Sequence, residues 1–113
     1  MSDSSTVVAI VKDPALLRSI GFALNAHGQV VEGFSDWPAA AAALKRADCV
    51  IIDACLPQAT VRDGFKLTQH GVKLVILAED DTDYGADASV HVLSKPLTGF
   101  DIANAVEALR KHT

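Results

Sequence analysis

The sequence has 113 residues, half of them hydrophobic, which suits one domain around a single core and excludes a second domain. Its formal net charge of -4 at pH 7 gives no basic excess, so neither a nucleic acid nor an anionic membrane is an expected partner. The polar start of the chain, and the lack of an apolar run long enough for a signal or a membrane span, predict a cytoplasmic protein.

Strand and helix patterns alternate from the start of the chain. Residues 7–11 form a short apolar run without polar alternation, which is typical of a strand covered on both faces. Pro14 begins a helix that runs to about Ala26 and is ended by Gly28, because proline favours the first turn and glycine the position after the last. A weaker strand follows over Gln29–Gly33.

The next helix has Ser35 or Asp36 as its N-cap and ends at Leu44. Thr98 and Asp101 resemble a capping box that opens a last helix, whose apolar face is made by Ile102, Ala105, Val106 and Leu109. Further strands are expected over residues 49–52, 74–77 and 89–93. Five strands joined by crossovers predict an α/β fold, a doubly wound parallel sheet with helices on both faces.

Asp53 directly follows the apolar strand 49–52, and the chain turns soon afterwards at Leu56-Pro57. A buried parallel strand that ends on a carboxylate delivers it to the carboxyl edge of the sheet, where open α/β folds bind their ligands. Asp53 is therefore the first candidate for a functional residue.

The cysteines and histidines suggest no metal centre. Cys49 and Cys55 would lie far apart along an extended chain, so we expect two thiols, with Cys55 as a small buried side chain. The four histidines lack the spacing of zinc ligands.

The order of these features resembles the receiver domain of bacterial two-component response regulators. The features are an acidic turn before Pro14, a strand ending on Asp53 with Leu56-Pro57 after it, a later Asp63-Gly64 and a last strand ending on Lys95-Pro96. The resemblance covers essentially the whole chain. It implies one flavodoxin-like domain over residues 1–113, with strand order 2-1-3-4-5 and a regulatory rather than enzymatic role.

The resemblance also implies the roles of single residues. Asp53 would stand where the family accepts a phosphoryl group from a phosphohistidine of a sensor kinase, and Lys95 would contact the phosphate. The family holds Mg²⁺ with two acids after the first strand, the acceptor aspartate and the backbone carbonyl two residues beyond it, here that of Cys55. Mg²⁺ is expected only if Asp53 is phosphorylated, and no other cofactor is expected.

The chain departs from the family pattern at the cation site, where it reads Val11-Lys12-Asp13-Pro14. If Pro14 is aligned with the family's proline, Val11 and Lys12 replace the metal-binding pair. If the strand end is aligned instead, Lys12 replaces one acid and Asp13 keeps the other. In either case the site loses charge, and we expect Lys12 to form an ion pair with Asp53 or Asp13.

Two switch positions are also substituted. Ala78 stands where the family has a serine or threonine that hydrogen-bonds the phosphate, and Val92 stands where an aromatic residue often swings inward. The acidic segment Glu79–Ala88 has no apolar stripe, so the family's fourth helix is expected to be shortened or missing.

Phe22 is the candidate partner-binding residue. It projects roughly opposite to the apolar face of the first helix, which makes it either an exposed anchor or a side chain folded onto a neighbouring helix. In receivers the first helix is a surface on which kinase helices dock.

We expect an atypical, stand-alone receiver that regulates a histidine kinase or response regulator by protein binding, independently of phosphorylation. The alternative is a working single-domain receiver, phosphorylated on Asp53 as a phosphoryl shuttle or sink. The expected partners are a sensor histidine kinase, a phosphotransfer protein or another response regulator, and a homodimer remains open.

Overall fold

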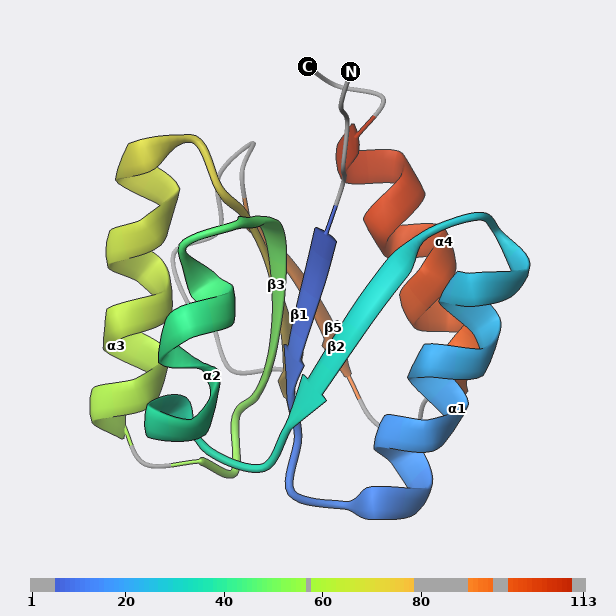
Figure 1. Ribbon diagram of the computed structural model, residues 1–113, viewed down its shortest axis with the longest axis horizontal. Coiled ribbons are helices and arrows are strands. Elements are labelled where there is room, and N and C mark those ends of the chain that lie inside the picture. The colour runs from blue at the N-terminus through green and yellow to red at the C-terminus, as the bar shows by residue number, and fades with distance from the viewer. Residues whose placement is uncertain (1–5, 57, 79–89, 95–97, 111–113) are drawn as a thin grey trace.

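The computed structural model describes residues 6–56, 58–78, 90–94 and 98–110. In this part of the chain, five strands alternate with four α-helices and one short 3-10 helix (Figure 1). The strands are β1 Thr6–Ile10, β2 Val30–Phe34, β3 Ala47–Asp53, β4 Lys73–Ala78 and β5 Val90–Ser94. The helices are α1 Pro14–Ala26, α2 Trp37–Leu44, α3 Gln58–Leu67, the 3-10 helix Thr68–His70 and α4 Gly99–Arg110.

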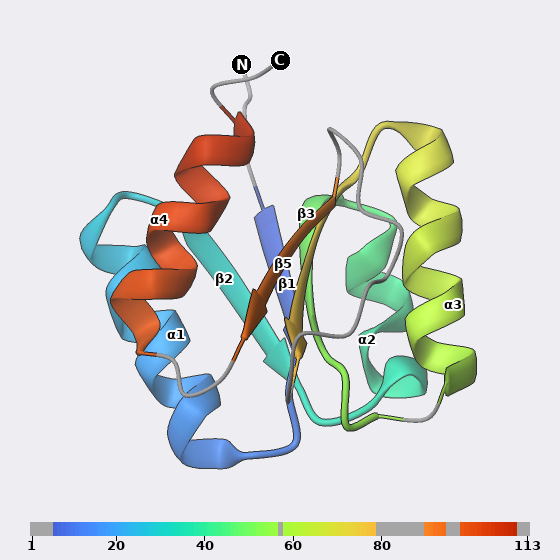
Figure 2. The same ribbon diagram turned by 180° about the vertical axis from the view of Figure 1, so that it is seen from behind.

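The strands form one parallel sheet in the order β2-β1-β3-β4-β5, which confirms the predicted topology. Helices α1 and α4 lie against one face of the sheet and α2 and α3 against the other (Figures 1 and 2). Every residue of β1 is buried, because its side chains alternate between two hydrophobic clusters, one under each pair of helices. Because helices cover both faces of the sheet, as predicted, polar and apolar residues do not alternate along this strand.

Side chains at the helix ends explain where the helices begin and stop. The Asp13 carboxylate accepts from the backbone N–H of Ala15 at 3.0 Å, so it caps α1, and Gly28 follows the helix with a φ of +77°. Asp36, and not Ser35, is the N-cap of α2. At α4, the predicted capping box is present as reciprocal hydrogen bonds between Thr98 and Asp101.

Some boundaries differ from those predicted. β2 begins one residue later and reaches Phe34, because it pairs in register with β1 from Thr6↔Val30 to Ile10↔Phe34. The expected shortening of the family's fourth helix concerns residues 79–88, which lie outside the described residues. No helix in the described ranges has the length and apolar character needed to cross a bilayer.

Helices α1 and α4 pack side by side and are held at two points. A side chain at Gly99 would overlap the Ser19 backbone carbonyl, so glycine permits the close approach of the two helices. Eight residues further along each helix, the His27 ring nitrogen Nδ1 lies 2.9 Å from Oε2 of Glu107. The two helices therefore run parallel in a fixed register.

We expect Gly99→Ala to destabilise the protein by about 1–3 kcal/mol, because the new methyl group meets backbone atoms that cannot rotate away. Gly21→Ala is the matched control, since a methyl group there meets no atom within 4 Å and lies inside α1. The control should be neutral or stabilising by about 0.5–1 kcal/mol. Urea unfolding measures both, and equal midpoints for Gly99→Ala and the wild type would contradict the close approach.

Candidate functional site

Asp53 is the last residue of β3 and lies at the carboxyl edge of the sheet, as predicted. Its side chain is buried, with 1% of its surface exposed, although it ends a strand next to a loop. One carboxylate oxygen, Oδ1, accepts the backbone N–H of Cys55 at 3.0 Å, and the Asp53 carbonyl accepts the N–H of Leu56 at 3.1 Å. The carboxylate thus holds the turn that leads towards α3.

Apolar residues flank Asp53 on both neighbouring strands. The β1–β3 register ends at Ile10↔Ile52, so continuing it by one residue places Val11 beside Asp53. On the other side, Leu77 of β4 pairs directly with Asp53. Val11 is 1% exposed and Leu77 is fully buried. The described residues beside Asp53 on the two neighbouring strands are therefore apolar.

Neither of the two charged residues after Val11 forms a salt bridge with Asp53. The Asp13 carboxylate is directed at the N-terminus of α1, where it accepts from the N–H groups of Ala15 and Leu16. Lys12 is exposed. Among the described residues it forms no salt bridge with Asp13 or Asp53, so the expected ion pair is not present. This placement favours the alignment in which Val11 and Lys12 replace the family's acidic pair.

The substituted switch positions lie in the sheet. Ala78 is fully buried at the end of β4 and pairs with Ser94 of β5. Neither Ala78 nor Leu77, the β4 residue beside Asp53, has a hydroxyl group. Val92 is half-buried and packs into the cluster under α2 and α3. Lys95 lies outside the described residues.

The expected burial of Cys55 is wrong, because this residue is exposed in the turn after β3, whereas Cys49 is buried; both are thiols. The turn held by Asp53 directs the Cys55 side chain away from the core. In the described ranges, no three His, Cys, Asp or Glu side chains come together as metal ligands.

Phe22 is 80% exposed on α1, so of its two sequence interpretations the exposed one is confirmed. Sequence reasoning missed a second exposed ring, Phe100 at the start of α4, which is 61% exposed. The sequence did contain a signal for this exposure, because Phe100 lies off the apolar face of the last helix. Phe22 is one turn after Ser19 and Phe100 follows Gly99, so both rings lie within a turn of the α1–α4 contact.

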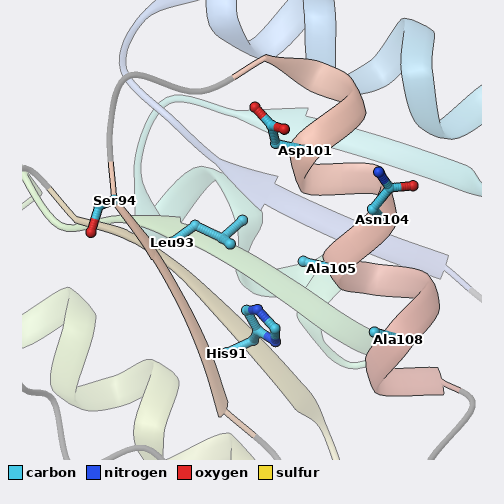
Figure 3. A pocket seen from close by; sticks show the side chains of 7 residues that line it. All are labelled: His91, Leu93, Ser94, Asp101, Asn104, Ala105 and Ala108. Atoms are coloured by element: carbon cyan, nitrogen blue, oxygen red, sulfur yellow. The ribbon is translucent and has the colours of Figure 1, made fainter.

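A separate hollow of about 470 Å³ lies between β5 and α4. His91 projects from the strand, and Asp101 and Asn104 project from the helix (Figure 3). The Asp101 oxygen Oδ2 already accepts from Thr98, so this carboxylate serves the start of the helix. The hollow lies on α4 beside the edge strand, apart from Asp53.

We expect Asp53→Ala to lower the free energy of unfolding by about 1–2 kcal/mol, because the Cys55 N–H loses its acceptor. Asp53→Asn keeps an oxygen at the same place and should cost less. Urea unfolding of the two variants against the wild type checks this order. If alanine is tolerated as well as asparagine, the carboxylate does not hold the turn.

Known proteins that are similar to this chain identify its fold. No family model matches the sequence. The transcriptional regulator protein FixT of Rhizobium meliloti (strain 1021) is 26% identical over an alignment 113 positions long, which covers 96% of this chain and 96% of FixT. A response regulator receiver protein from Sinorhizobium medicae WSM419 superposes with a TM-score of 0.77 at 21% identity, covering 96% of both chains.

Two further solved structures have a similar fold. The chemotaxis response regulator CheY4 of Vibrio cholerae has a TM-score of 0.76 at 18% identity, covering 95% of this chain and 99% of its own. A response regulator from Thermotoga maritima has a TM-score of 0.75 at 15% identity, covering 96% and 98%. Together with the strand order, these similarities show that the chain has the fold of a response regulator receiver domain.

Proposed function

We propose that this protein is an atypical receiver that regulates a two-component signalling pathway by protein binding, without phosphorylation of Asp53. Its partner is a histidine kinase or, in the same pathway, a phosphotransfer protein or response regulator. The observation that carries this proposal is the contrast in exposure between two positions. Phe22 presents 80% of its surface to solvent, whereas Asp53 presents 1%.

Helices α1 and α4 each expose an aromatic ring that an apolar partner surface could cover. Phe22 stands among small or polar neighbours, which leave its ring prominent, and Arg18 is the charged residue beside it. Phe100, at the start of α4, is a second exposed aromatic ring. Large aromatic side chains that are exposed in the free protein are the usual anchors of protein interfaces.

The region around Asp53 gives little support to phosphoryl transfer. A phosphodonor must bring a tetrahedral phosphate to a carboxylate oxygen, and the oxygens here lie behind a surface that is almost closed. The residues beside Asp53, Val11 and Leu77, supply no charge or hydroxyl to a transferring phosphate. The name of the relative FixT, a transcriptional regulator protein, agrees with a regulatory role.

Partner binding is tested with the purified histidine kinases of the source organism, one at a time, by measuring affinity and kinase autophosphorylation. We expect one kinase to bind and to change its autophosphorylation rate. Phe22→Ala should weaken this binding roughly tenfold or more, because it removes a central aromatic anchor. Val30→Ala is the control, since Val30 is an exposed apolar residue on a different element, β2. If both variants lose the same amount of binding affinity, Phe22 is not the anchor.

Phosphorylation is tested by incubating the protein with acetyl phosphate and Mg²⁺ and measuring its intact mass. We expect no phosphoryl mass that depends on Asp53, because the carboxylate is buried and its described neighbours on β1 and β4, Val11 and Leu77, are uncharged. Stoichiometric labelling that Asp53→Asn abolishes would instead establish the alternative, a working phosphoryl shuttle or sink.

A further inference from the structure

The receiver fold implies a divalent cation beside the aspartate at the end of β3, and the residues around Asp53 can be tested against that requirement. Mg²⁺ needs several oxygen ligands at about 2.0–2.1 Å in octahedral geometry, usually carboxylates, carbonyls and waters. A fitting site would therefore surround Asp53 with further oxygen atoms and leave an opening for water.

Within the described part of the chain, the two side chains that flank Asp53 on the neighbouring strands carry no oxygen atom. Val11, beside it on β1, is an aliphatic residue packed into the cluster under α1 and α4. Leu77, its partner on β4, belongs to the same cluster. Both side chains are buried, so the strands on either side of Asp53 supply its carboxylate with no oxygen ligand.

The next residues along the chain oppose a cation in two different ways. Lys12 places a permanent positive charge at this edge, and like charges repel a divalent ion. Asp13 is acidic, but its oxygen Oδ1 accepts from the Ala15 N–H at 3.0 Å at the start of α1. Moving this carboxylate to Asp53 would leave the helix without its cap.

We propose that the carboxyl edge of the sheet at Asp53 is a turn-forming site that is closed to divalent cations, with Val11 and Lys12 as the residues that close it. Asp53 here acts as the acceptor for the Cys55 N–H at 3.0 Å, and this bond fixes the turn after β3. The inference rests on the proposed phosphorylation-independent function and deepens it, because it names the residues that separate this site from a cation-dependent one.

The test is a titration of the full-length protein with Mn²⁺ as the probe, followed by isothermal calorimetry. We expect the wild type and Asp53→Asn to give the same isotherm, so that any cation bound elsewhere on this acidic chain cancels. Binding by the wild type that Asp53→Asn abolishes would overturn the proposal.

Two gain-of-binding variants test the residues named. Lys12→Asp changes an exposed position, should fold normally, and should acquire Mn²⁺ binding that a second change, Asp53→Asn, removes. Val11→Asp combined with Lys12→Asp should bind more tightly still where circular dichroism shows that it folds. If Lys12→Asp is folded and gains no binding, Val11 and Lys12 are not the closing residues as proposed.

This experiment contains no protein partner, so its result is independent of the kinase measurements. Cation binding at Asp53 would overturn this inference and leave recognition through Phe22 intact. A failure of every kinase to bind would overturn the proposed function and leave the closed site standing.

Discussion

Burial of the sheet on both faces is the constraint on which the rest of this structure depends. The side chains of β1, and most of those of β3 and β4, are buried between α1 and α4 on one face and α2 and α3 on the other. Each buried valine or isoleucine side chain stabilises the fold by about 1.5–3 kcal/mol, so the strands tolerate few polar residues. Polar chemistry is therefore restricted to the strand ends, where Asp53 lies.

The elements that could be predicted from the sequence are those with strong local signals. Apolar runs predicted the central strands, and Pro14, Gly28 and the Thr98–Asp101 capping box predicted helix ends that the structure confirms. The predicted ends of β2 were less accurate, because they depend on how β2 pairs with β1, and this pairing is not a local property of the sequence. The choice of Asp36 over Ser35 as a cap likewise depends on three-dimensional geometry.

The location of the candidate site could be predicted, but its chemistry could not. A strand ending on Asp53 indicated the edge of the sheet, yet the sequence left two alignments open, and Asp13 stayed a metal-binding acid in only one of them. The structure favours the cap, because the backbone N–H groups of the first turn need an acceptor. The directions of Lys12 and Cys55 follow from the same local geometry, and the exposure of Phe100 follows from how α4 lies on the sheet.

The close packing of α1 against α4 joins two parts of the chain that are synthesised at different times. Ser19 and Gly99, like His27 and Glu107, are separated by eighty residues. During translation, α1 leaves the ribosome long before α4 exists, and until then its inner face lacks its neighbour. The second exposed ring, Phe100, is therefore added only after nearly the whole domain has been made. A partner that contacts both Phe22 and Phe100 would bind only chains that extend into α4.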